Sequence, residues 1–320
     1  MSSERLRREG AGELDGLLNV LKPPGMTSHD VVDRVRRLLG VRRVGHTGTL
    51  DPGAAGVLVL CVGRATRLVE WLHAEDKEYR AELVLGIATD TQDAFGAPQR
   101  VERGCAVPRE ALLATLGRFV GAIEQVPPMA SAVKRQGRRL YELARAGVEV
   151  ERAPRTVHIR RLTPVRIEPD DDVLGFGTRV LFDVVCSKGT YVRTLCADIG
   201  AALGCGAYMS FLLRTRVGAL TIDSARTLDE LERDVAAGIP VLLPMDAALA
   251  AWPKVTLDAA GARRIRHGQP VAAGAEGAGE GRTGQVWLAR LYDENGRLLA
   301  LAAAERRGGN IVWRPRVVFS

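Results

Sequence analysis

The chain has 320 residues, of which 46% are hydrophobic, and five cysteines without a CxxC pair. This is enough apolar material for one large domain and a small one, while no apolar run approaches the ~18 residues of a membrane helix. The charged N-terminus lacks the apolar segment of a secretory signal, and unpaired cysteines are typical of a reducing compartment. We therefore expect a cytoplasmic monomer without a membrane segment, and the His and Cys spacing predicts no metal site.

The net charge of +7 favours a polyanionic partner, and this charge is unevenly distributed. Residues 251–320 carry 11 Lys and Arg against 6 Asp and Glu, which is +5 of the total. In the rest of the chain, basic residues cluster at 34–43, 134–139 and 152–161. Each cluster alone is equally compatible with a solvated surface, but three clusters and a basic tail together favour nucleic acid.

The apolar periodicity up to residue 250 predicts a mixture of strands and helices without a repeated strand–helix–strand unit. This pattern indicates an α+β domain over residues 15–250, with a mixed, largely antiparallel sheet flanked by helices, after a disordered lead-in at 1–14. In chain order the expected elements are a strand over Leu17–Leu21, a helix capped by Thr27 or Ser28 and ended by Gly40, strands over Val57–Val62 and Lys77–Leu85, a helix from Pro108 to Phe119, strands at about 156–167 and 179–187, a helix capped by Thr190, a strand at about 207–218, and a helix near Leu228–Val235.

The tail after residue 250 has a different pattern, which predicts a small β-rich domain over residues 251–320. Strand-like segments at Gln285–Leu291 and Arg297–Ala304 are joined by the hairpin turn Glu294-Asn295-Gly296, and Ile311–Phe319 is a third candidate strand. A loop rich in Gly, Ala and Glu, residues 272–284, precedes them.

The segment GHTGTLDPGAAGVLVL, residues 45–60, carries one carboxylate, Asp51, in a loop of small residues before an apolar strand. Asp-Pro-Gly is ordinary turn chemistry, and on this pattern alone a plain turn is the simpler interpretation. The lack of bulk on both sides, however, leaves room for a large ligand to reach the carboxylate. A carboxylate is a nucleophile when a positive neighbour keeps it ionised, and His46, Arg42 and Arg43 flank the loop as candidate RNA contacts.

Two further residues are candidates for chemistry, each with a simpler alternative. Arg193 lies in the first turn of a helix, where it can serve as the positive neighbour or as an ordinary surface arginine. Tyr79 lies on the apolar side of its strand, so it is either a core tyrosine or a ring that stacks on a flat base and offers a hydroxyl.

Five ordered segments of the chain resemble the bacterial tRNA pseudouridine synthase B family, and the resemblance spans roughly residues 15–250. The second and fifth of these segments are long and specific. The segments are KPPGMTS at 22–28, GHTGTLDPGAAGVL at 45–58, KEYRAEL at 77–83, LGIATDTQDAFG at 85–96 and SKGTYVRTLCADIG at 187–200.

The resemblance implies conversion of uridine 55 in the tRNA T-loop to pseudouridine, on a flipped-out nucleotide and without cofactor or metal. It implies that Asp51 is the catalytic aspartate and that Arg193 pairs with it. Tyr79 would stack on the uracil and act in proton transfer at C5. Whether the carboxylate attacks C6 or C1′, or assists elimination at the sugar, stays open. The residues that the resemblance assigns to substrate binding are His46, Tyr191, Leu212, Lys22 and Arg43.

The tail resembles, more loosely, the PUA-like β domain of such enzymes, which implies RNA contact, with the acceptor stem as the expected partner besides the T-arm. A small stabilising domain without RNA contact is the alternative for this tail. For the whole chain, the alternatives are a tRNA-binding or tRNA-folding factor with secondary catalysis, and a synthase that acts on another RNA uridine. A guide-RNA-dependent relative is disfavoured, because the chain has no long Lys-rich tail.

Overall fold

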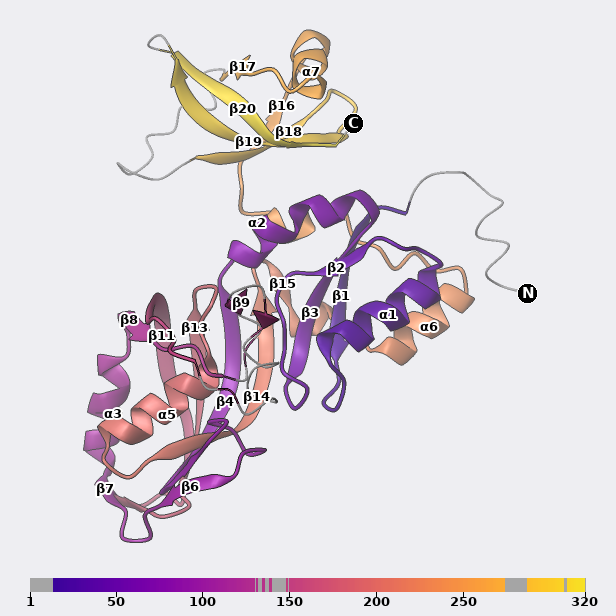
Figure 1. Ribbon diagram of the computed structural model, residues 1–320. Helices are drawn as coiled ribbons and strands as arrows, with labels where there is room; N and C mark the ends of the chain where they lie inside the picture. Colours follow the sequence, from indigo (N-terminus) through magenta and orange to yellow (C-terminus); the bar gives the residue numbers. More distant parts are fainter. Residues whose placement is uncertain are drawn as a thin grey trace.

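The computed structural model describes residues 14–129, 131, 134–135, 138–139, 148, 150–273, 287–307 and 310–319. It shows a large α+β unit, with a smaller β unit stacked at one end of it (Figure 1). The expected lead-in, apart from residue 14, and most of the expected loop at 272–284 lie outside the described residues. Among the described residues, no helix combines the length and the apolar character needed to cross a membrane.

One nine-stranded sheet runs through the large unit, and all its pairings are antiparallel except that of β14 with β3. The expectation of a mixed, largely antiparallel sheet is therefore confirmed. Along the sheet the order is β1 (Gly16–Lys22), β3 (Ala55–Val62), β14 (Ala207–Val217), β4 (Lys77–Leu85), β13 (Arg179–Cys186), β11 (Arg155–Glu168) and β8 (Gly121–Gln125), with β2 (Val44–His46) on β3 and β15 (Leu220–Thr221) on β14.

Strands β1 and β3 are covered on both faces, which explains why their sequences are almost continuously apolar. Helices α1 (Ser28–Leu39) and α6 (Leu228–Ala236) pack on one face. The other face is covered by η1 (Gly63–Leu68) and α2 (Val69–Ala74). Helix α1 begins with a capping box at Thr27 and ends at Gly40 in the left-handed region, as its sequence predicts.

In the part of the chain that the structure describes, the other half of the sheet is covered on one face only, by α3 (Arg109–Arg118) and α5 (Val192–Ala202). The uncovered face carries cross-strand ion pairs, such as Arg80 with Asp183 and Arg161 with Glu78. This arrangement explains the alternation of apolar and charged residues in β4. Tyr79 and Arg214 are cross-strand neighbours on the covered face.

Short hairpins and turns complete the large unit. The loop between β5 and β6 matters most for the site, because it brings Asp93 beside α5. These remaining elements are β5 (Ile87–Thr89) with β6 (Pro98–Val101), β7 (Ala106–Pro108) with β12 (Val173–Gly175), β9 (Lys134–Arg135) with β10 (Arg138–Arg139), η2 (Ile222–Ser224) and η3 (Ala247–Leu249).

The described residues of the small unit form a five-stranded sheet and one helix, and the unit packs against the large unit through a shared apolar cluster. Tyr292 and Phe319 of the small unit share that cluster with Leu68 of η1, and Trp71 of α2 meets Trp252 edge-to-face. Its elements are β16 (Lys254–Thr256), α7 (Ala259–Arg266), β17 (Val271–Ala272), β18 (Leu288–Tyr292), β19 (Leu298–Arg307) and β20 (Asn310–Val318).

One predicted helix start is wrong. Thr190 does not cap α5; its hydroxyl donates to the carbonyl of Ser187 and closes the preceding turn. Tyr191 occupies the cap position, and Gln125 of β8 binds its backbone: the Tyr191 N–H donates to Oε1 at 3.0 Å, and Nε2 donates to the Tyr191 carbonyl at 3.2 Å. A contact from a distant strand therefore decides where this helix begins.

Candidate active site

The loop that carries Asp51 is clamped from several sides, although its residues are small. Leu50 and Ala54, on either side of the carboxylate, are buried in the same apolar cluster as Tyr79. The Ser28 hydroxyl accepts from the Leu50 N–H at 2.9 Å and donates to the Leu50 carbonyl at 3.1 Å. These contacts hold the backbone on both sides of Asp51, whose side chain stays 39% exposed.

Lys22 provides a second clamp from beneath the loop. Its side chain is fully buried, and its ammonium donates to the carbonyls of Ala54 at 2.7 Å and Pro52 at 3.3 Å. Burial lowers the pKa of Lys22 to about 8, and the nearby Asp51 charge opposes that shift. The expectation that Lys22 contacts substrate does not fit this position, because the buried ammonium already donates to carbonyls of the loop backbone.

Arg193 joins the Asp51 loop to a second carboxylate. The guanidinium is 5% exposed, with Nη2 at 3.4 Å from Asp51 Oδ2 and Nη1 at 3.5 Å from Asp93 Oδ2. Asp93 is fixed in turn, because its Oδ1 accepts from the Thr91 hydroxyl at 2.6 Å. The predicted pairing of Arg193 with Asp51 is therefore present in the structure, and it is one half of a carboxylate–guanidinium–carboxylate chain.

The charge balance of Asp51 follows from this chain. Burial raises the pKa of the Asp51 carboxyl, Arg193 opposes the rise, Asp93 adds to it, and Lys22 opposes it. A carboxylate in such a recess tends to protonate unless a cation stays beside it. Arg193 is the larger of the two cationic influences that favour the ionised form of Asp51.

Tyr79 lies in β4 and is almost fully buried. Burial raises the pKa of its hydroxyl, whereas the positive charge of Arg214 and a hydrogen bond from it lower that pKa. Arg214 is itself buried, and it donates from Nε to the Val57 carbonyl at 2.7 Å and from Nη2 to the Gly48 carbonyl at 3.0 Å. One arginine thus connects the Tyr79 hydroxyl to both ends of the segment that contains Asp51.

The other predicted substrate-binding residues occupy different parts of this region. Tyr191 is half-buried, and its ring centre lies 5.9 Å from the Arg193 guanidinium carbon. Leu212 is half-buried beside Ala81 and packs on the cluster that contains Tyr79. His46 ends β2, five residues before Asp51, and is half-buried.

Arg43 is exposed, and its guanidinium donates to the Thr66 hydroxyl at 3.3 Å, so it lies on the surface beside η1. In this position it is accessible to a large ligand. None of its described contacts joins it to Asp51, Tyr79 or Arg193.

Sequence reasoning missed Arg214 and Asp93. The available signal for Arg214 was an arginine two residues after Leu212, on the same side of a strand that was already assigned to the pocket wall. Asp93 lies in the segment LGIATDTQDAFG, residues 85–96, where no local feature distinguishes it from Asp90, the other carboxylate of this polar loop. Only the tertiary contact with Arg193 separates the two.

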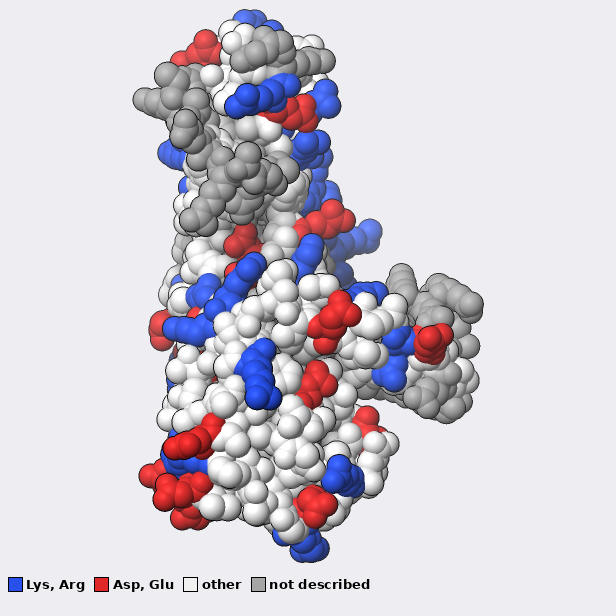
Figure 2. Space-filling view, turned by 90° about the vertical axis from the view of Figure 1, so that its left-hand side faces the viewer, with Lys and Arg blue, Asp and Glu red and all other residues white. Residues whose placement is uncertain are grey.

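Two of the three basic clusters contain arginines that are paired with carboxylates. In the first, Arg34 pairs with Asp229 and Glu232. In the third, Arg160 pairs with Asp76. The side chains of the cluster at 134–139 lie outside the described residues. Figure 2 shows basic and acidic side chains interspersed among the described residues of the face it presents.

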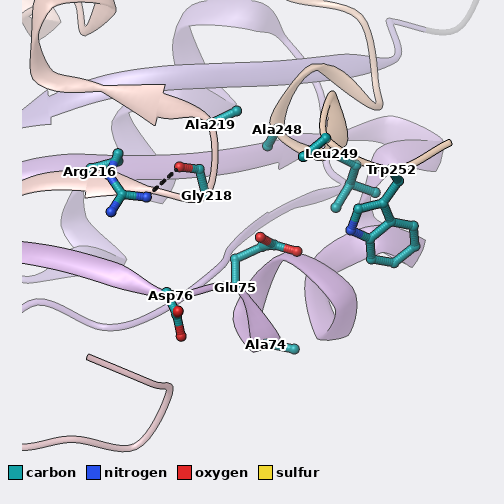
Figure 3. Close-up of a pocket in the computed structure, with 10 residues that line it drawn as sticks. Ala74, Glu75, Asp76, Arg216, Gly218, Ala219, Ala248, Leu249 and Trp252 are labelled. Atoms are coloured by element: carbon teal, nitrogen blue, oxygen red, sulfur yellow. Dashed lines mark hydrogen bonds between the residues drawn. The ribbon is translucent and has the colours of Figure 1, made fainter. Parts of the chain in front are cut away.

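A separate cleft of about 440 Å³ lies where α2, the β14–β15 turn and η3 meet (Figure 3). Its wall includes Glu75 and Trp252; burial raises the pKa of Glu75, and a hydrogen bond with Trp252 opposes the rise. Arg216 lines the cleft and donates to the Gly218 carbonyl at 3.0 Å. The lining does not include Asp51, so this cleft is distinct from the candidate site at the loop.

Family models match almost the whole chain. The N-terminal domain of TruB family pseudouridylate synthases matches residues 36–192. The C-terminal domain of tRNA pseudouridylate synthase B matches residues 193–250, and the C-terminal region of pseudouridine synthase II TruB matches residues 253–318. The last match coincides with the small β unit.

Individual relatives agree with these matches. A tRNA pseudouridine synthase B from Symbiobacterium thermophilum is 55% identical over 82% of this chain and 85% of its own length. A tRNA pseudouridine synthase B from Moorella thermoacetica is 48% identical over 95% of this chain and 99% of its own length.

Among solved structures, a chain from a Cbf5-Nop10-Gar1 complex aligns with a TM-score of 0.70 and 30% identity, covering 95% of this chain and 85% of that chain. A chain from an H/ACA RNP bound to a substrate RNA containing 2'-deoxyuridine aligns with the same TM-score and 28% identity, over the same shares of the two chains. The fold is therefore that of a pseudouridine synthase, an isomerase. More narrowly, the chain belongs to the TruB family of tRNA pseudouridine synthases.

Proposed function

We propose that this protein converts uridine 55 of the tRNA T-loop to pseudouridine, with Asp51 as the catalytic carboxylate. The observation that carries the proposal is the buried Arg193, which pairs with Asp51 at 3.4 Å in a recess where the carboxyl would otherwise tend to protonate. A turn with no chemical role has no need of a buried arginine. The high identity to enzymes named tRNA pseudouridine synthase B, against 28–30% for the Cbf5-type structures, favours tRNA as the substrate.

The reaction breaks the bond from C1′ to N1 of uracil, turns the base and forms the bond from C1′ to C5. N1 ends with a proton, and C5 loses one. Attack at C6, attack at C1′ and assisted elimination all begin from an ionised carboxylate. The role we assign to Arg193 is to keep Asp51 ionised, and it is the same for all three routes.

We propose that the Tyr79 ring stacks on the turned-out uracil and that its hydroxyl takes part in removing the C5 proton. Proton acceptance requires stabilisation of the phenolate, which burial opposes. Arg214 acts against that burial, because its charge and its hydrogen bond both lower the pKa of Tyr79. Leu212 and Tyr191 would complete the apolar and aromatic wall of the base pocket.

A uridine inside a folded loop is unreachable, so the nucleotide must leave its stack at a cost of a few kcal/mol. We propose that His46 and Arg43 hold the T-loop with the base turned out, and that residues 251–320 bind the acceptor stem. The +5 charge of that tail supports RNA contact, because phosphate contacts supply much of the affinity. Residues 15–250 are then the catalytic domain, and no cofactor or metal takes part in this proposal.

The test is tritium release from tRNA transcripts that are labelled at C5 of uridine and carry uridine or cytidine at position 55. Wild type should release tritium only from the uridine-55 transcript, and Asp51→Asn should release none while its Kd for tRNA stays near the wild-type value. Glu232→Gln, at an exposed carboxylate of α6 that pairs with Arg34, is the matched control and should react like wild type. Release from the cytidine-55 transcript at the wild-type rate would reject uridine 55 as the target.

A further inference from the structure

Phe95 is the most exposed large apolar side chain of the described residues, with 80% of its surface accessible. The chain has only six phenylalanines, and a fully solvated ring contributes nothing to the core. Single exposed apolar residues are common on protein surfaces, so exposure alone carries no meaning. Its position beside the candidate nucleophile distinguishes this ring from such residues.

The ring lies against the Asp51 loop. A Cβ atom built on Gly53 would come within 2.2 Å of Phe95 Cε2 and within 2.6 Å of its Cζ, so the ring edge occupies the space that the missing side chain leaves. Gly53 is two residues after Asp51. The glycine therefore admits an aromatic ring against the loop, two residues from the carboxylate.

The backbone that presents the ring is held by hydrogen bonds. The Phe95 N–H donates at 3.0 Å to Oδ1 of Asp93, and Asp93 is the residue whose other oxygen pairs with Arg193. The Thr89 hydroxyl donates to the Asp93 carbonyl at 2.8 Å, which closes the same loop from the other side. Because the loop is ordered before any ligand arrives, little entropy is lost when a base stacks on the ring.

We propose that Phe95 is a substrate-positioning residue: its ring stacks on the nucleobase next to the target uridine and holds the RNA strand at the mouth of the site. This inference rests on the proposed function, which supplies the RNA. Unpaired bases that leave a loop stack on aromatic side chains, whatever their sequence. Tyr79 takes the target base in this arrangement, and Phe95 takes its neighbour on the far side of Asp51.

The first experiment measures binding without turnover. All variants are made in an Asp51→Asn background, and the probe is a fluorescent T-arm stem-loop RNA followed by anisotropy. Removing a base–aromatic stack weakens binding roughly 5- to 150-fold, so Phe95→Ala should raise the Kd by a factor in that range. Phe95→Leu should lose a similar factor, because it keeps an apolar side chain but no ring, and Phe95→Tyr should restore most of the affinity.

Phe211→Ala is the matched control. Phe211 is also exposed, at 43%, but its cross-strand partner is Glu82, on the sheet face opposite Tyr79. This variant should bind like its parent. If Phe95→Ala also binds like its parent, the proposal is overturned.

Abasic RNAs identify the stacked base. Each nucleotide that flanks uridine 55 is replaced in turn by an abasic residue, and both the parent and Phe95→Ala are titrated. At one flanking position the abasic RNA should bind the parent as weakly as the intact RNA binds Phe95→Ala, with no further loss when both changes are combined. A Phe95→Ala effect that is equally large on every abasic RNA would show that the ring does not stack on a flanking base.

Gly53→Ala tests the position of the ring independently. Its Cβ would displace the ring, so it should weaken binding when Phe95 is present and have little effect beside Phe95→Ala. Equal losses in both backgrounds would overturn the assigned contact. The proposed function itself is judged separately, by tritium release from wild type. If wild type releases tritium and Phe95→Ala has an unchanged Kd, only the role of Phe95 is rejected. If wild type releases no tritium, the target uridine is rejected.

Discussion

Replacing Arg193 by lysine keeps the positive charge but removes the geometry on which the site depends. The guanidinium places one nitrogen against Asp51 and a different nitrogen against Asp93, at 3.4 and 3.5 Å. An ammonium has a single nitrogen, so it cannot reproduce this two-sided contact. In Arg193→Lys one of the two carboxylates loses its partner inside a recess where burial already favours protonation of Asp51.

The size of the effect follows from the value of one charged contact. The Arg193–Asp51 contact is an ion pair at 3.4 Å, and its value lies between the ~1 kcal/mol of an exposed pair and the ~3 kcal/mol lost when a buried pair is broken. A loss in this range corresponds to a roughly 5- to 150-fold change in rate if the contact supports the transition state. Arg193 is 5% exposed but the Asp51 side chain is 39% exposed, so water can solvate only one partner of the lost contact and we expect the middle of this range. Arg193→Met removes both contacts and should be slower still.

The assay is single-turnover tritium release at saturating enzyme, so that weaker tRNA binding cannot imitate a slower chemical step. The Kd for tRNA is measured alongside and should change little, since phosphate contacts supply most of the affinity. A rate for Arg193→Lys close to that of wild type would remove Arg193 from the active site. A rate loss accompanied by an equal loss of binding would assign it to the RNA surface.

Three further outcomes are expected. Asp93→Asn removes a charge that raises the pKa of Asp51, so the acidic limb of the single-turnover pH profile should move to lower pH; a move to higher pH contradicts this. Burial lowers the pKa of Lys22 from 10.5 to about 8, so between these pH values the unfolded chain binds more protons than the folded chain. The cost of burying Lys22 therefore falls as the pH rises through this window. The free energy of unfolding of wild type, measured by urea titration against Lys22→Met, should gain roughly 1.4 kcal/mol per pH unit in that window, and an absent slope contradicts this. Arg263→Gln on α7 should weaken tRNA binding and lower the salt slope by about 0.9, whereas an unchanged slope shows that Arg263 contacts no phosphate.

Local signals predicted several elements well. Helix α1 has the expected cap and end because Thr27 and Gly40 determine them within one turn of chain. Strand β4 was predictable because buried and more exposed positions alternate along it, so apolar and charged residues alternate in its sequence. The start of α5 was predicted wrongly because a distant residue, Gln125, binds the backbone of Tyr191.

The helix α7 was not anticipated within the tail, although Asp258 caps it in the ordinary way. Its few apolar residues, Ala262 and Ile265, give too short a periodic pattern to predict a helix, and only their burial against the small sheet reveals it. Deleting residues 251–320 would be a poor test of what the tail does. Leu68 and its neighbours share an apolar cluster with the tail, so truncation would expose the core of the large unit.

The candidate site could be predicted only as far as residues act locally or through a known family pattern. Arg214 reaches the candidate site because β14 pairs in parallel with β3, where Arg214 lies beside Gly56. A Cβ added to Gly56 would lie 2.2 Å from the Arg214 carbonyl oxygen. Strand register of this kind depends on the whole sheet, including the irregularity between Met209 and Phe211, and no window of sequence contains it.

The surroundings of the Asp51 loop explain why it carries so little side-chain bulk. A plain turn needs its Pro and Gly only for backbone geometry, but here the absence of side chains also serves the surroundings. Gly53 leaves the space that the Phe95 ring fills, and Gly56 allows the backbone of Arg214 to approach. The small residues are therefore required by two neighbours, the loop that carries Phe95 and strand β14, which carries Arg214. This shared requirement goes beyond turn geometry and supports our proposal that the loop presents its carboxylate to a ligand.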